Sequence, residues 1–121
     1  MGDTKSKIYS NEIMQVILNI LKNSQDNFKE QATKDPKITI TCECPLSDTY
    51  FLKIFDNGGG IPEDIINKIF DPYFSTKSEK NGTGLGLYMS KTIIEEHHDG
   101  KLSVENTDDG VCFIIEFRIT S

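Results

Sequence analysis

Apolar residues recur with a helical period near the N-terminus of the chain. The spacing i, i+3, i+4, i+7 and i+8 holds for Ile13, Val16, Ile17, Ile20 and Leu21. Residues at this spacing share one face of a helix, so we expect an amphipathic helix over residues 10–29. Residues 1–9 are polar and predict a flexible or trimmed N-terminal segment, with room for one short strand at most.

Four later stretches are predicted as β-strands, at residues 38–44, 50–55, 102–105 and 111–119. The first of them alternates apolar and polar residues with the period of a strand. A short Pro-containing turn joins the first two, and a Gly-containing turn joins the last two. Because short connections favour antiparallel pairing, we expect two hairpins.

Two further helices are predicted between the strand pairs. Residues 62–70 begin with a proline and two acids and have an apolar side, and residues 85–97 contain a second apolar set. Residues 71–86 lack periodicity and predict a loop. This order of elements predicts an α+β fold. We expect a two-layer α/β sandwich, with a mixed, mostly antiparallel sheet covered on one face by three helices.

Composition narrows the class of protein. The 121 residues suit one domain, and the formal net charge of -6 argues against a nucleic-acid-binding face, which needs clustered Lys and Arg. The three cysteines lack a metal-ligand spacing and indicate reduced thiols. The sequence shows no apolar run of membrane-spanning length and no signal peptide, so we expect a cytoplasmic fragment that is not inserted in a membrane.

A carboxylate followed by three glycines ends the second predicted strand, in the sequence DNGGGIP at residues 56–62. Glycines remove side chains where something must approach the backbone. A carboxylate beside such a gap can accept hydrogen bonds from an amino group. A tight turn before a helix has the same features, so the run by itself leaves both interpretations open.

The first predicted helix carries a polar stripe beside its apolar face. At about 100° per residue, Asn19, Asn23, Asp26 and Asn27 lie close together on the helix surface. Asn is unfavourable inside a helix, and its amide oxygen can bind a Mg²⁺ ion that also contacts phosphates. A solvated helix edge rich in Asn is the alternative.

The sequence NGTGLGL at residues 81–87 runs directly into the last predicted helix. Free N–H groups at a helix start form an anion site, and glycines let phosphate oxygens approach. Lys77 lies just upstream, where it can reach such phosphates or be an ordinary surface lysine. Phe70, Tyr73 and Phe74 precede it and predict an aromatic cluster that anchors the loop.

Taken in order, these segments resemble the motifs of one superfamily, the Bergerat-fold ATPases, which include gyrase, Hsp90, MutL and the histidine kinases. Residues 15–24 look like the N box, 56–61 like the G1 box, 70–77 like the F box and 82–87 like the G2 box. The resemblance covers roughly residues 10–119. The F box and the GTGLGL motif are similar to those of the catalytic and ATP-binding domain of sensor histidine kinases.

The resemblance implies a role for each matching position. Asn23 corresponds to the Mg²⁺-binding Asn, Asp56 to the carboxylate that accepts from the adenine amino group, and residues 71–86 to the ATP lid. We assign Asn19 and Lys77 to the catalytic set. The implied ATP-binding residues are Asn19, Asn23, Asp56, Gly58, Gly60, Ile61, Lys77, Gly82, Thr83, Gly84, Leu85, Gly86 and Leu87.

Position 19 separates the subfamilies of this superfamily. Hydrolytic members carry a Glu one turn before the Mg²⁺-binding Asn, whereas this chain has Asn19. An amide cannot take a proton from water at neutral pH. The site is therefore expected to hold ATP for phosphoryl transfer rather than for hydrolysis.

Three features depart from the family pattern. No phosphoacceptor motif is present, Val111 replaces a Thr near the adenine, and little strand material precedes the N box. We therefore expect residues 10–121 to form the catalytic domain, with the acceptor histidine upstream in a longer protein or on another chain. With Val111 in place of Thr, adenine binding relies more on Asp56 and water.

The resemblance also implies a function and partners. The domain is expected to bind ATP and Mg²⁺ and to donate the γ-phosphoryl group to a histidine on a separate dimerisation domain in two-component signalling, with a response regulator as an indirect partner. An anti-sigma-factor-type Ser/Thr kinase and a nucleotide-sensing module without transfer are the alternatives. We expect a cytoplasmic monomer with no nucleic-acid partner, and leave open whether the parent protein is membrane-anchored.

Overall fold

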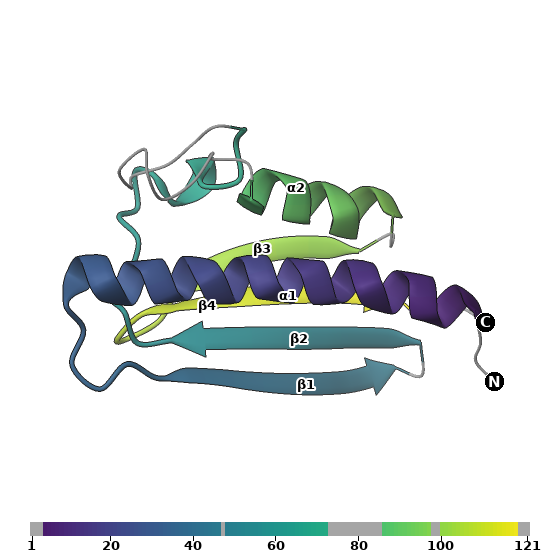
Figure 1. The fold of residues 1–121 in the computed structure, drawn as a ribbon, viewed down its shortest axis with the longest axis horizontal. Coiled ribbons are helices and arrows are strands. Elements are labelled where there is room, and N and C mark those ends of the chain that lie inside the picture. Colours follow the sequence, from purple (N-terminus) through teal and green to yellow (C-terminus); the bar gives the residue numbers. More distant parts are fainter. Residues whose placement is uncertain (1–3, 47, 73–85, 98–99, 119–121) are drawn as a thin grey trace.

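The computed structural model describes residues 4–46, 48–72, 86–97 and 100–118. Its elements alternate between helices and strand pairs (Figure 1). In chain order they are α1 (Thr4–Gln31), β1 (Ile38–Leu46), β2 (Thr49–Asp56), the 3₁₀ turn η1 (Ile66–Lys68), α2 (Gly86–Thr92), the π-helical turn η3 (Ile93–His97), β3 (Lys101–Asn106) and β4 (Val111–Arg118).

Four antiparallel strands form one sheet, in the order β1-β2-β4-β3. Both predicted hairpins are confirmed, since β1 pairs with β2 and β3 pairs with β4. The two hairpins join through β2 and β4, whose register places Leu52 opposite Ile115 and Asp56 opposite Val111. The end of β2 therefore lies beside the start of β4, next to the turn of the second hairpin.

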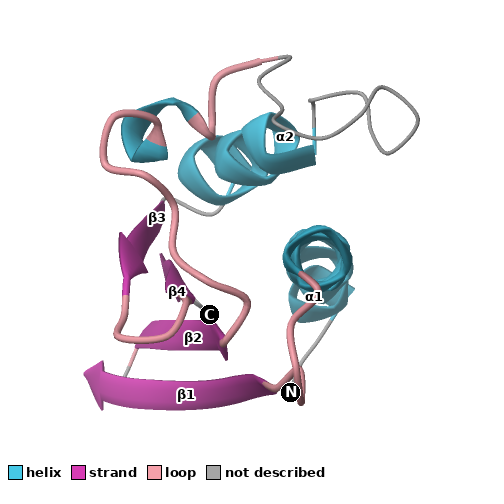
Figure 2. Cartoon of the chain, turned by 90° about the vertical axis from the view of Figure 1, so that its left-hand side faces the viewer, coloured by secondary structure: helices cyan, strands magenta, loops and turns pink. Residues whose placement is uncertain are grey.

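Both α-helices lie on the same side of the twisted sheet (Figure 2). The core between the layers contains fully buried apolar side chains from α1, η3 and three strands. From α1, the buried core residues are Val16 and Ile20, which lie on the apolar face that the helical period of the sequence predicts. The other fully buried apolar residues are Ile54, Ile94, Leu102, Cys112, Phe113 and Ile115.

The prediction of a helix over residues 62–70 is wrong, because this segment is a series of tight turns around η1. Pro62 O accepts from both Ile65 N and Ile66 N at 3.0 Å, and the next turns continue with i to i+3 hydrogen bonds. Pro72 closes the segment after only ten residues, since a proline disfavours helical geometry in the residue before it. The described residues thus contain two α-helices on the sheet rather than three.

The two α-helices also differ from their predicted lengths. The helix predicted from residue 10 begins at Thr4, so residues 4–9 are helical and not a strand. They contain no Gly or Pro that would end the helix. The helix predicted over 85–97 begins as α2 and changes into the π-helical turn η3 after Thr92. That the N-terminal segment is flexible or trimmed stays a prediction.

All three cysteines are free thiols, as expected. Cys42 and Cys44 are exposed on β1, while Cys112 is buried in the core. Burial raises the pKa of the Cys112 thiol above its ordinary value, and the nearby Glu105 carboxylate adds to this effect. Within the part of the chain that is described, no helix combines the length and the apolar character needed to cross a membrane.

Candidate functional site

Asp56 ends β2 as a buried carboxylate with two hydrogen-bond donors. Only 4% of the residue is exposed. Its Oδ1 accepts from Gly58 N at 3.0 Å, and its Oδ2 accepts from the hydroxyl of Ser24 on α1 at 2.8 Å. One donor is local and the other comes from the opposite layer, so the carboxylate is fixed between the sheet and the helix.

The glycines after Asp56 are needed where the protein packs against itself. Gly59 has a φ of +90°, a conformation that favours glycine. A Cβ at Gly58 would lie 2.8 Å from Asn27 Nδ2, and one at Gly60 would lie 2.8 Å from Asn106 Oδ1. At both positions the missing side chain gives space to an asparagine of the protein.

These asparagines hold the glycine-rich loop from two sides. From α1, Asn27 Nδ2 donates to Gly58 O at 2.9 Å. From the end of β3, Asn106 receives a hydrogen bond from Ile61 N at 2.7 Å and donates one to Ile61 O at 2.8 Å. The loop is therefore clamped between the helix and the second hairpin, and its backbone has little freedom to move.

Asn19 connects α1 with the beginning of α2. Its Nδ2 donates to Ser90 Oγ at 3.1 Å and to Gly86 O at 3.5 Å, while Ser90 Oγ donates to the same carbonyl at 2.8 Å. The structure thus brings the predicted residues Asn19 and Gly86 together, although they are 67 positions apart in the sequence.

Asn23 occupies the turn of α1 between these two contacts. It follows Asn19 by one helical turn and directly precedes Ser24, which contacts Asp56. Its side chain is half-buried, like those of Asn19 and Asn27 on the same stripe. The polar stripe therefore runs from the first turn of α2 to the glycine loop that follows Asp56.

The described residues contain no group of three or more His, Cys, Asp or Glu side chains that could hold a metal ion. The predicted Mg²⁺ ligand, Asn23, offers only one amide oxygen. Mg²⁺ commonly completes its shell with water and substrate phosphates. An ion bound by Asn23 therefore fits this site only together with a phosphate-bearing ligand.

Part of the predicted nucleotide site lies outside the described residues. This part comprises Lys77, Gly82, Thr83, Gly84 and Leu85, and with them most of the predicted lid. Two members of the last motif are described. Gly86 begins α2 and is exposed, and Leu87 is half-buried and packs against the core. Ile61, at the end of the glycine loop, also packs against the core.

Phe70, one of the three aromatic residues of the predicted cluster, packs against the core. Its ring packs edge-on against Phe113 with centroids 6.3 Å apart, and Lys91 Nζ lies 5.1 Å from the centroid of the Phe70 ring. Tyr73 and Phe74, which the sequence places in the same cluster, fall outside the described residues.

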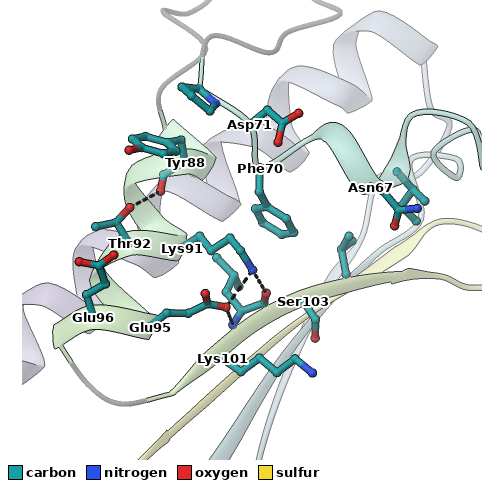
Figure 3. A pocket seen from close by; sticks show the side chains of 14 residues that line it. Asn67, Phe70, Asp71, Tyr88, Lys91, Thr92, Glu95, Glu96, Lys101 and Ser103 are labelled. Carbon is teal, nitrogen blue, oxygen red and sulfur yellow. Dashed lines mark hydrogen bonds and ion pairs between the residues drawn. The ribbon is translucent and has the colours of Figure 1, made fainter.

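A hollow of about 520 Å³ lies beside Phe70, between η1, α2 and β3 (Figure 3). Lys91 is among its lining residues, with Nζ 2.8 Å from Glu95 Oε2 and 3.3 Å from Leu102 O. The lining includes neither Asp56 nor the asparagine stripe. The hollow is thus separate from the polar site between α1 and the glycine loop.

Sequence reasoning missed Ser24 and Asn106, which both contact the predicted site. Ser24 is fully buried and Asn106 half-buried. A serine directly after Asn23 inside a helix was a weak signal, because polar residues in a buried helix need a partner. Asn106 sits at an ordinary strand end, and only the packing of the second hairpin brings it to Ile61.

The family model described as "Histidine kinase-, DNA gyrase B-, and HSP90-like ATPase" matches residues 9–121. Among curated relatives, the chain is 32% identical over 118 residues to sensor protein kinase PilS of Pseudomonas aeruginosa. This alignment covers 96% of the chain and 22% of PilS. The chain is 35% identical over 118 residues to sporulation kinase A of Bacillus subtilis, covering 93% of this chain and 18% of that protein. The chain therefore spans about a fifth of the length of these relatives.

A solved structure of similar fold is the catalytic domain of the histidine kinase ThkA. It superposes with a TM-score of 0.75 at 38% identity, over 92% of this chain and 69% of that chain. ThkA has also been solved in complex with the response regulator protein TrrA, where the match has a TM-score of 0.66 at 34% identity and covers 89% of this chain and 28% of that chain.

Proposed function

Because this chain belongs to the family of histidine kinase-, DNA gyrase B- and HSP90-like ATPases, we propose that it is the ATP-binding catalytic domain of a sensor histidine kinase. The observation that carries the proposal is the carboxylate of Asp56. It is buried at the end of β2, held by donors from two layers and next to a clamped glycine loop. Such a group can accept a hydrogen bond from a nucleobase amino group at a fixed place.

The nucleotide would extend along the asparagine stripe of α1. Its adenine amino group would bind Asp56, beside Gly58, Gly60 and Ile61. Asn23 would bind a Mg²⁺ ion shared with the phosphates, which the ion would neutralise when bound. The phosphates would reach the first turn of α2, where Gly86 and the preceding glycines would supply N–H groups. The Asn19 contacts support this path, because they join the stripe to α2.

The chemistry proposed is phosphoryl transfer to a histidine. An imidazole nitrogen of the acceptor attacks the γ-phosphorus, the bond between that phosphorus and the β,γ-bridging oxygen breaks, and ADP leaves with the electron pair. Asn19 occupies the position where a hydrolytic enzyme would need a base, and its amide donates to Ser90 and Gly86. An amide cannot activate water. ATP would therefore persist until the acceptor arrives, with Lys77 stabilising charge on the transferred group.

The acceptor histidine would be on a separate dimerisation domain of a longer protein. This chain spans only about a fifth of PilS and of sporulation kinase A. A response regulator would be the next partner, as TrrA is for ThkA in their solved complex. A cytoplasmic location for the domain suits both partners.

Transfer to a supplied dimerisation domain tests this function. The chain is incubated with Mg²⁺, ATP labelled at the γ-phosphate and the dimerisation domain of its parent protein. Labelled phosphate on that domain that is lost in acid and stable in base indicates phosphohistidine. Acid-stable phosphate on serine would favour the Ser/Thr kinase alternative, and nucleotide binding without transfer would favour a sensing module.

A further inference from the structure

Ser24 lies on the side of α1 that faces the sheet, one residue after Asn23. It is fully buried, and its Oγ is 2.8 Å from Asp56 Oδ2. A carboxylate oxygen can only accept when ionised, so the serine hydroxyl is the donor. The helix that carries the asparagine stripe thus also touches the carboxylate directly.

The direction of this hydrogen bond is unusual for a serine inside a helix. Such a hydroxyl commonly donates to the carbonyl oxygen one turn earlier. Ser90 does so, because its Oγ donates to Gly86 O at 2.8 Å. Ser24 instead donates its only proton to a residue 32 positions away. Its hydroxyl therefore acts on Asp56 and not on the backbone of α1.

The torsion that turns the plane of an aspartate carboxylate is broad and weakly restrained by itself. Two donors from different elements fix it here. Gly58 N binds Oδ1 from the glycine loop, and Ser24 Oγ binds Oδ2 from α1. With one proton donor on each oxygen, the remaining lone pairs have defined directions.

We propose that Ser24 is a positioning residue for nucleobase recognition. Its hydroxyl fixes the carboxylate plane of Asp56, so that a free lone pair points at the exocyclic amino group of the purine. The inference rests on the proposed ATP site and adds to it a residue that discriminates between purines. Removal of the hydroxyl should weaken binding only of ligands that carry this amino group.

The experiment compares two ligands on three proteins. Wild type, Ser24→Ala and Ser24→Cys are titrated calorimetrically, in the presence of Mg²⁺, with ATP and with purine riboside 5′-triphosphate, which lacks the 6-amino group. Wild type should prefer ATP. Ser24→Ala should bind ATP about tenfold more weakly, the scale of one hydrogen bond to a charged group, and should bind the analogue as wild type does. Ser24→Cys, with a weak donor of similar size, should fall between them.

Two controls separate positioning from folding. Alanine is favourable in a helix, so Ser24→Ala should still unfold cooperatively. Loss of the buried hydrogen bond to Asp56 should lower the unfolding temperature, so both ligands are titrated at a temperature at which the variant is folded. Ser90→Ala removes the other fully buried serine and should leave the ratio of the two affinities unchanged.

The outcomes also separate this inference from the proposed function. If Ser24→Ala weakens both ligands equally, or leaves ATP affinity unchanged, the positioning role is refuted while the ATP site stands. If wild type binds both ligands equally, Asp56 does not recognise the 6-amino group, and the positioning role of Ser24 is refuted as well. If wild type binds neither ligand, the proposed function itself is refuted.

Discussion

The two ends of the asparagine stripe on α1 are built differently. At the Asp56 end, the interacting side chains are almost fully enclosed, with Ser24 0% and Asp56 4% exposed. At the α2 end, Ser90 is also fully buried, but its two partners are not, since Asn19 is half-buried and Gly86 is exposed. Buried hydrogen bonds are fixed by the fold, whereas exposed ones can be exchanged for bonds to a ligand. We infer that the end proposed for the nucleobase is formed before binding and that the end proposed for the phosphates is adjusted by the ligand.

The largest expected effect comes from Asp56→Asn, which replaces an acceptor-only group by an amide at the enclosed end. Binding of ATP should fall by about 100-fold or more, because a buried charge-assisted acceptor is lost. Calorimetric titration with Mg-ATP measures this. Asp64→Asn, the same change at an exposed position, should bind ATP normally. Equal affinities of the two variants would remove the adenine role of Asp56.

Asn23→Ala should produce a smaller and more selective loss in the middle of the stripe. Adenine recognition should remain, while the tightening of ATP binding by Mg²⁺ should shrink by about tenfold, the scale of one lost ligand to the ion. The measurement is ATP affinity with Mg²⁺ and with a chelator. Asn67→Ala, an exposed asparagine in η1, is the matched control. Affinity that depends on Mg²⁺ as strongly as in wild type would show that Asn23 does not hold the ion.

Asn106→Ala tests whether the glycine loop needs its clamp. The side chain makes two hydrogen bonds to Ile61 and a third, of 3.1 Å, to Glu63. Its loss should lower the free energy of unfolding by about 1–3 kcal/mol, measured by chemical denaturation. ATP affinity should fall only severalfold, since Asp56 keeps both donors. A stability equal to that of wild type would show that the other contacts of the loop, such as Asn27 Nδ2 to Gly58 O and Gly59 N to Asp109 O, hold it without Asn106.

Ser90→Ala tests the α2 end of the stripe and should have the smallest effect of the four variants. The helix remains favourable for alanine, and Asn19 keeps Gly86 O as a partner. We expect the free energy of unfolding to change by less than about 1 kcal/mol and ATP affinity to change less than about threefold. A loss of ATP affinity of about tenfold, as expected for Ser24→Ala, would contradict the difference between the two ends.

Periodicity predicted the elements better than their lengths. The apolar face of α1 and both hairpins are confirmed, because a helix or a hairpin is encoded in contacts between neighbours in the sequence. The segment 62–70 was predicted as a helix because Pro62 and its acids are typical of a helix start. A second proline ten residues later and i to i+3 hydrogen bonds made it a set of turns instead.

The family was also predictable, and the match over residues 9–121 confirms it. Four motifs in order at fitting distances carry more information than any one of them, since each has an ordinary structural explanation. The roles of single residues within those motifs stay predictions, including the assignments of Asn19, Asn23 and Lys77.

By itself, the sequence determined the strand pairs, the amphipathic face of α1 and the order of the motifs, because these depend on local spacing. The tertiary structure alone decided which hairpin strands meet in the middle of the sheet and which side chains reach the glycine loop. Asp56 could be read from the sequence as an acceptor, but Ser24 could not be read as its partner, nor Asn106 as the partner of Ile61. Their contacts span 32 and 45 positions, and a hydrogen bond over such a distance exists only after the layers have packed.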